Sequence, residues 1–240
     1  MKLALISDIH GNWHALKAVW ARLEKEEPDQ IICGGDIVGY GAFPAECVKW
    51  VREHCDISVR GNHDHHVVQI SGAHNFNPRA YAALAWTAEN IPEDDLEWLA
   101  AMPMTAELDD IRITHGHPML PEAWLYILDR HQADMALKSV EEKIVITGHS
   151  HVQACFLESE APARLVHFRE IELGSRRSVL NPGSVGQPRD GDPRASFAIL
   201  DTEAWTYAPM RVAYDVEGAR EAILEAGLPA ELGDRLLAGY

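Results

Sequence analysis

The sequence predicts an α/β fold that begins with parallel strands and continues into a half richer in strands. Between residues 2 and 64, three apolar strand-like segments alternate with two helical segments. This order is typical of parallel strands joined by crossover helices, because parallel neighbours need a long connection. After residue 102 short apolar segments dominate, and residues 165–173 alternate as an antiparallel strand does.

Length and composition indicate one globular domain. The chain has 240 residues, of which 47% are hydrophobic and 24% charged, as expected for a single domain with a proper core. We therefore predict one domain over residues 1–240, with a helical excursion at about residues 65–102. The formal net charge of −16 argues against binding to nucleic acid or to anionic membranes, because both need clustered lysine and arginine.

The cysteines and the apolar segments indicate where the protein works. None of the four cysteines forms a CxxC pair, which fits reduced thiols inside the cell. The apolar run Leu3 to Ile6 is too short for a signal peptide, and no segment has the length of a membrane span. We expect a cytoplasmic protein without membrane contact.

The first strand, Lys2 to Ile6, leads directly to Asp8 and His10. The two side chains alternate, so on an extended backbone they point the same way. A carboxylate beside an imidazole at a strand end is typical of metal ligands, and a capped helix start is the alternative. A helix from about Trp13 to Glu26 follows, with apolar residues at three- and four-residue steps.

The stretch around Asp36 is the centre of the first half. An apolar run, Ile31 to Cys33, ends in two glycines and then Asp36, at the edge where open α/β sheets usually bind ligands. A second helix covers about Pro44 to His54, and a third strand covers Ile57 to Val59. That strand ends in the polar cluster Arg60-Gly61-Asn62-His63-Asp64.

The second half repeats the pattern of histidines after strands. A hairpin at residues 105–108 and 111–114 leads to His115, and a strand at residues 143–146 leads to His149 and His151. The roles of His65, His66 and His117 stay open. The remaining expected elements are helices at about 131–140, 216–225 and 231–238, a Pro- and Gly-rich loop at 179–190, and strands at 195–200 and 206–214.

Eight polar residues follow strand ends in this sequence, and together they are hard to explain by structure alone. Buried polar groups in such number need partners, and charged ones need an ion pair or a metal. Oxygen and nitrogen ligands without thiolates suit Mn, Fe, Co, Ni or Zn. The set is too large for one ion, so we expect two divalent ions that share Asp36. The polar residues that follow strand ends are Asp8, His10, Asp36, Asn62, His63, His115, His149 and His151.

Five short motifs that contain these residues, taken in chain order, resemble those of the calcineurin-like metallophosphoesterase superfamily. They read D-x-H, G-D, G-N-H-D, H and G-H-x-H, and they extend from residue 7 to about residue 190. The stretches SDIHGN, GGDIVGYG, TGHSH and NPGSVGQPRD are similar to its small prokaryotic phosphodiesterase and diadenosine-tetraphosphatase-like branch. The resemblance implies a four-layer α/β/β/α β-sandwich flanked by helices.

The resemblance also implies a function. The protein would hydrolyse phosphate mono- or diesters of small or nucleotide-like substrates with a hydroxide activated by two metals. His63 would contact the phosphate or protonate the leaving oxygen; orienting Asn62 or the water is its alternative role. Arg60 and Arg189 are the remaining candidates for phosphate contact, with a surface ion pair as the alternative for each. The implied ligands are Asp8, His10, Asp36 and His151 for one ion, and Asp36, Asn62, His115 and His149 for the other.

The chain departs from the protein Ser/Thr phosphatases of this superfamily, which read GDYVDRG. Gly39 replaces the aspartate that supports their catalytic histidine, and Tyr40 replaces their phosphate-binding arginine. A protein phosphatase is therefore disfavoured. A nuclease using the same site is an alternative against which the acidic charge counts. A non-catalytic scaffold of the same fold is another, disfavoured because every ligand position is filled.

Overall fold

The structure, a computed structural model, describes residues 1–73, 76–159, 164–165 and 169–240. In these residues two six-stranded sheets pack face to face. The first sheet contains β1 (Lys2–Ile6), β2 (Gln30–Cys33), β3 (Ile57–Ser58), β9 (Ile171–Glu172), β11 (Ala195–Asp201) and β12 (Thr206–Val212). The second contains β4 (Thr105–Leu108), β5 (Ile111–Thr114), β6 (Ile144–Ile146), β7 (Gln153–Leu157), β8 (Arg164–Leu165) and β10 (Ser178–Pro182).

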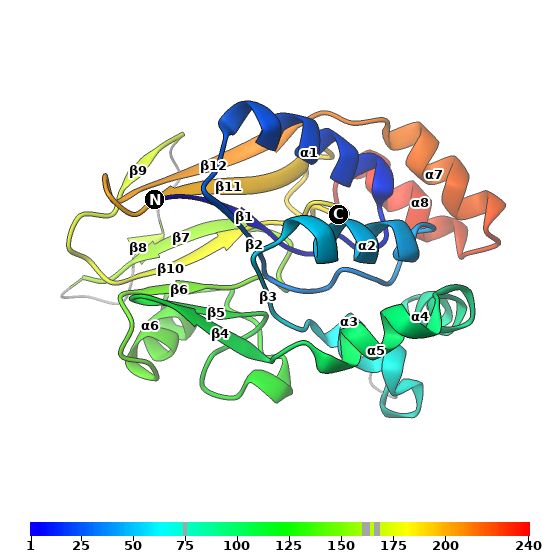
Figure 1. Cartoon of the computed structure of the whole chain (residues 1–240), viewed down its shortest axis with the longest axis horizontal. Helices are drawn as coiled ribbons and strands as arrows, with labels where there is room; N and C mark the ends of the chain where they lie inside the picture. Colours follow the sequence, from blue (N-terminus) through cyan, green and yellow to red (C-terminus); the bar gives the residue numbers. More distant parts are fainter. Residues whose placement is uncertain (74–75, 160–163, 166–168) are drawn as a thin grey trace.

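Helices cover the outer faces of both sheets, so the predicted four-layer sandwich is confirmed (Figure 1). The described helices are α1 (Trp13–Glu26), α2 (Pro44–His54), α3 (Asn62–Val68), α4 (Pro78–Asn90), α5 (Glu93–Ala101), α6 (Arg130–Lys138), α7 (Val216–Glu225) and α8 (Ala230–Ala238). Helices α1 and α2 lie on the first sheet and α6 lies on the second.

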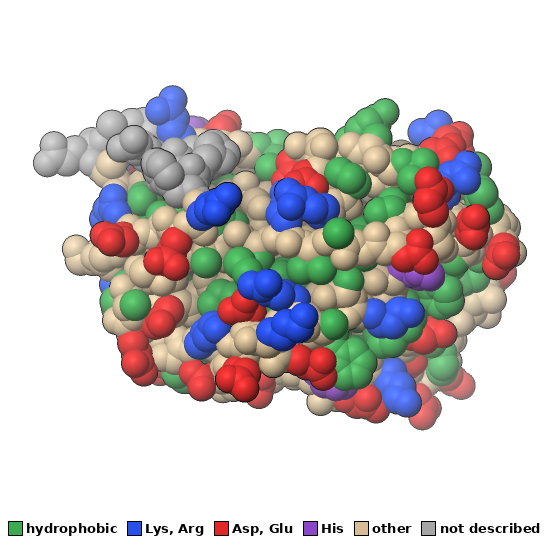
Figure 2. All heavy atoms as spheres, turned by 90° about the horizontal axis from the view of Figure 1, so that it is seen from above, with side chains coloured by type: hydrophobic (Ala, Val, Ile, Leu, Met, Phe, Trp, Pro, Cys, Tyr) green, Lys and Arg blue, Asp and Glu red, His purple; other side chains and the backbone are tan. Residues whose placement is uncertain are grey.

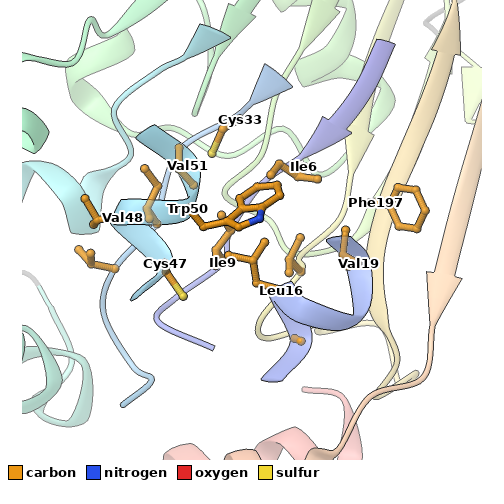
Figure 3. Packing of buried hydrophobic residues seen from close by; sticks show 14 of the residues in the cluster. Ile6, Ile9, Leu16, Val19, Cys33, Cys47, Val48, Trp50, Val51 and Phe197 are labelled. Atoms are coloured by element: carbon orange, nitrogen blue, oxygen red, sulfur yellow. The ribbon is translucent and has the colours of Figure 1, made fainter. Parts of the chain in front are cut away.

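Successive side chains of a strand point to opposite faces of the sheet, so each central strand packs both against the other sheet and against the helices outside. In β1, Leu3 and Leu5 point into the core between the two sheets, whereas Ala4 and Ile6 point towards α1 and α2. Around the outward-facing Ile6, the side chains labelled in Figure 3 come from α1, α2, β2, β11 and the turn after β1. Burial of both strand faces explains why β1 reads as an uninterrupted apolar run.

Both sheets mix parallel and antiparallel neighbours, so parallel pairing is not confined to the first half of the chain. The first sheet has the order β3-β2-β1-β11-β12-β9, and the second β4-β5-β6-β10-β7-β8. In the first, β3, β2 and β1 are parallel and β11 joins β1 antiparallel. In the second, β5, β6 and β10 are parallel and β7 joins antiparallel. The carboxyl ends of the parallel strands therefore meet from both sheets.

Several boundaries differ from the predicted ones. The sequence did not predict strands β7 and β10. In β10, the Asn181-Pro182-Gly183 sequence at the end of the strand indicated a loop instead. Helices α3 to α5 fill the predicted excursion, which begins earlier, at Asn62. Of the expected strand at residues 165–173, residues 166–168 lie outside the described part of the chain. No helix in the described ranges combines the length and the hydropathy that crossing a bilayer requires.

Candidate metal centre

The ends of the parallel strands deliver the predicted ligands to one place. Asp8 and His10 follow β1, Asp36 follows β2, His115 follows β5, and His149 and His151 follow β6. The ligand atoms form two groups, each with all its atoms within 4.8 Å of one another, and Asp36 belongs to both. One group is Asp8, His10, Asp36 and His151; the other is Asp36, His115 and His149.

Asn62 lies at the start of α3 and lines the same cavity as Asp36. Its side chain is almost fully buried, and its Oδ1 atom has no hydrogen-bond partner among the described residues. An unpaired buried amide oxygen is costly, and a cation beside it would remove that cost. Asn62 therefore fits the second ligand group, as the sequence predicts.

Three of the histidines are held in one orientation by backbone carbonyls. A carbonyl oxygen only accepts, so the Nδ1 atom of each ring carries the proton and the Nε2 atom keeps its lone pair. In metal sites such bonds fix the tautomer and direct the free nitrogen towards the ion. The bonds join His10 to Val38 (3.0 Å), His115 to Gly34 (2.8 Å) and His151 to Gln187 (2.6 Å).

The free lone pairs face one another and two carboxylates. The Nε2 atoms of His10 and His151 are 3.1 Å apart, and His151 Nε2 is 3.2 Å from Asp8 Oδ1. His115 Nε2 is 3.3 Å from Asp36 Oδ2. All of these side chains are buried, where unpaired like charges and facing lone pairs are expensive. The donor set therefore fits divalent cations with nitrogen and oxygen ligands.

The pKa shifts agree with this picture. Burial lowers the pKa of His10 and of His151 well below the usual value, and that of His149 to about 3. These rings are therefore neutral, the form that binds metal. Burial opposes ionisation of Asp36, but nearby His115 holds the pKa of Asp36 well below its usual range. His115 is the exception: burial opposes its protonation, but Asp36 raises its pKa to about 9. In the metal-free protein this ring is therefore a cation paired with Asp36, and a bound ion would take the place of its Nε2 proton.

The backbone at these positions is unusual. Non-glycine residues rarely adopt positive φ, because Cβ then crowds the backbone, and such residues gather at functional sites. Five of the seven predicted ligands have it, with φ of 54° at Asp8, 51° at His10, 54° at Asp36, 67° at His149 and 60° at His151.

His63 lies on the wall of the cavity among aromatic rings. Its ring centroid is 4.7 Å from that of His10, 4.5 Å from Tyr40 and 4.9 Å from Phe76. Its Nδ1 atom is buried and has no hydrogen-bond partner in the described part of the chain. A Cβ atom on Gly39 would collide with that nitrogen. The His63 ring therefore fills space that is open only because residue 39 is glycine and not the aspartate found in the Ser/Thr phosphatases.

The two predicted phosphate-binding arginines lie in different places. The structure does not bring Arg60 into the cavity: its guanidinium donates to the carbonyl of Met102 at 2.6 and 3.0 Å. Arg189 lines the cavity, 5.9 Å from the ring of Tyr40. Its guanidinium donates to Gln187 at 3.0 Å, while its buried Nε atom has no partner within the described ranges. Arg189 is thus the arginine with a donor to spare beside the cluster.

The cavity above the cluster measures about 330 Å³. Its walls include the aromatic side chains of Tyr40, Phe76, Trp124 and Tyr126. Of these four, only Tyr40 was recognised from the sequence, at the position of the missing phosphate-binding arginine. Trp124 and Tyr126 come from the irregular segment between β5 and α6, where no periodicity marks a wall residue. Their only signal in the sequence is an apolar and aromatic run soon after His115.

The other histidines belong to neither ligand group within the described residues. His65 lies on α3 beside Trp124, with 5.9 Å between ring centroids, and His66 lines the cavity. His117 is buried, and its Nδ1 atom accepts a bond from the backbone of Met119 at 3.2 Å. It therefore stabilises the segment that carries the aromatic wall.

Comparisons with known proteins agree with the fold and the site. Residues 1–204 match the model of the calcineurin-like phosphoesterase superfamily domain. An uncharacterized protein of Methanocaldococcus jannaschii is 37% identical over 99% of this chain and 98% of its own length. The phosphodiesterase YfcE of Escherichia coli is 26% identical over 85% of this chain and 89% of its own.

A solved structure gives the same result. The metallophosphoesterase of Sphaerobacter thermophilus superposes with a TM-score of 0.90 and 37% identity, covering 100% of this chain and 99% of that one. The two-sheet fold and the buried aspartate–histidine cluster are those of a hydrolase that acts on phosphoester bonds. The chain belongs to the calcineurin-like phosphoesterase superfamily.

Proposed function

We propose that the protein is a two-metal phosphoesterase for small or nucleotide-like phosphate esters, with phosphodiesters as the leading substrates. The observation that carries the proposal is the place of Asp36 in both ligand groups, since one carboxylate can then bridge two ions. Asp8, His10, Asp36 and His151 would hold one ion. Asp36, Asn62, His115 and His149 would hold the other.

Each part of the site has a task in this scheme. Two bound cations, Mn, Fe, Co, Ni or Zn, would lower the pKa of water and neutralise charge on the phosphoryl oxygens. Arg189 would donate its unpaired Nε–H to a phosphate oxygen. His63 would contact the phosphate or protonate the leaving oxygen. Burial lowers the pKa of His63 to about 4 in the protein alone, and a phosphate anion beside the ring would raise it.

Several observations support a small substrate. The cavity has the size of a site for one small molecule. The net charge is −16, and on the face in Figure 2 lysine and arginine are interspersed with acidic side chains. A nuclease would need a basic surface. The phosphodiesterase YfcE supports diester hydrolysis, and the four free cysteines fit the predicted cytoplasmic location.

A substrate and metal screen tests this function. Purified protein is stripped with chelator, loaded with each metal in turn, and assayed on bis-p-nitrophenyl phosphate, p-nitrophenyl phosphate, cyclic nucleotides and dinucleoside polyphosphates. We expect metal-dependent turnover, highest on a diester. A protein that binds two metals yet turns over no ester would contradict the function and favour the scaffold.

A further inference from the structure

His149 differs from the other histidines of the cluster in how its ring is held. It presents Nδ1 to the cluster, 3.2 Å from His115 Nε2. The other three rings present Nε2 and are fixed through Nδ1 by carbonyls. Among the described residues no hydrogen bond reaches the Nε2 atom of His149. Within the described part of the chain, its orientation is therefore set by a contact other than the usual outer hydrogen bond.

The contact that takes this place is an aromatic stack. The ring of Tyr126 lies parallel to that of His149, with an interplanar angle of 9° and 3.9 Å between centroids. Stacked rings resist rotation and displacement of either partner. His149 also has an unusual backbone, with φ of 67°, so its side chain needs support from outside its own turn.

The segment that carries Tyr126 is itself held on both sides. On one side, the backbone N–H of His117 donates to the carbonyl of Leu125 at 2.9 Å. On the other, Ile127 is buried in the core beneath α6. Tyr126 thus projects from a fixed segment between two anchors, although 42% of the residue is exposed.

We propose that Tyr126 is a positioning residue, whose ring holds His149 so that Nδ1 faces the second metal ion. This inference depends on the proposed two-metal function. It predicts that removal of the Tyr126 ring lowers the affinity for the ion at His115 and His149 and leaves the affinity for the other ion unchanged. Loss of an outer partner of a metal-binding histidine typically costs about 10–100-fold in metal affinity, and we expect about 10-fold from a stack.

Calorimetric titration of chelator-stripped protein with Mn²⁺, without any assay of turnover, tests the proposal. Wild type should bind two ions. Tyr126→Leu should weaken the site of His115 and His149 about 10-fold and leave the other unchanged. Tyr126→Phe keeps the ring and should bind as wild type does. Leu128→Ala, at a residue of the same segment that is 61% exposed, is the control for disturbance of the segment.

A double mutant separates positioning from general damage. In a His149→Ala background, Tyr126→Leu should change Mn²⁺ affinity less than about 2-fold, because the ring has nothing left to hold. Equal Mn²⁺ affinities in wild type and Tyr126→Leu would overturn the proposal. So would a Tyr126→Phe variant that binds Mn²⁺ as weakly as Tyr126→Leu does. An undiminished effect of Tyr126→Leu on Mn²⁺ affinity in the His149→Ala background would overturn it as well. Wild type binding only one ion would overturn the two-metal function, and with it this proposal.

Discussion

At the residue scale, the site depends most on side chains with two tasks. Asp36 belongs to both ligand groups, and its Oδ1 atom also accepts the backbone N–H of His63 at 2.8 Å. One carboxylate thus connects both proposed ions to the proposed catalytic histidine. A change at this position acts on all three.

We expect Asp36→Asn to remove most activity and most of the second metal together, because an amide is a weak bridge between two cations. Metal analysis after dialysis, beside an assay on bis-p-nitrophenyl phosphate, measures both. The control is Asp134→Asn, which removes a carboxylate paired with Lys138 on the surface of α6. Two full equivalents retained in Asp36→Asn would show that Asp36 is not the bridge.

We expect His63→Ala to keep both metals and lose about 10²–10⁴-fold in kcat, the usual contribution of a general acid. The loss should be smaller for p-nitrophenyl esters, whose leaving group hardly needs protonation, than for alkyl or nucleoside esters. Steady-state kinetics on matched diesters measures the difference. Equal losses would reject the acid role and leave phosphate contact, and loss of metal would make His63 structural.

At the element scale, Asp64 connects β2 to the start of α3. Its buried carboxylate accepts four backbone N–H groups, at 2.7 to 3.2 Å, from Asp36, Ile37, Val38 and Gly61. Burial raises the pKa of Asp64 to about 7, with the charge of Asp36 adding to the rise. The sequence shows the residue but not this role, since the four donors lie on two segments.

We expect Asp64→Asn to lower the free energy of unfolding by about 2–4 kcal/mol, because its amide would set an N–H group against backbone donors. Urea unfolding of chelator-treated protein measures this without a contribution from metal. Asp134→Asn serves again as the surface control and should change stability by less than about 1 kcal/mol. Asp64→Asn as stable as wild type would contradict the role of Asp64 as a link.

Elements that the sequence predicted well carry their own signals. The spacing of apolar residues in α1 and the proline that opens α2 are local features, and both helices have the predicted bounds. Strand β10 was missed because the prolines and glycines of residues 179–190 indicated a loop. Pro182 stands at the last pair of the β10–β7 ladder, opposite Gln153. Long-range pairing, which no local pattern records, made this segment a strand between β6 and β7.

The candidate site could be predicted further than the fold around it. Its seven predicted ligands follow strands or open a helix, and order and spacing identify them as a set. The wall residues could not be found that way. Tyr126 contacts His149 because two irregular segments meet in space, and the position of Arg60 depends on a carbonyl of Met102, far along the chain.

At the scale of the whole molecule, metal should stabilise the fold, because its ligands come from both sheets. A site filled at 100 times its Kd adds about 2.7 kcal/mol, and about 1 kcal/mol raises Tm by about 2–4 °C at this size. We expect Tm to rise by at least about 5 °C when Mn²⁺ is added to stripped protein. Thermal unfolding measures it, and the rise should shrink in Asp36→Asn.

The positive φ angles at Asp8, His10, Asp36, His149 and His151 have a consequence for how such a protein evolves. A left-handed residue other than glycine costs roughly 1–2 kcal/mol, a cost that metal binding would offset at these five positions. A descendant that abandoned the metals would gain stability by accepting glycine at these positions. Glycines there in a related sequence would therefore identify a lineage that has kept the architecture and lost the chemistry.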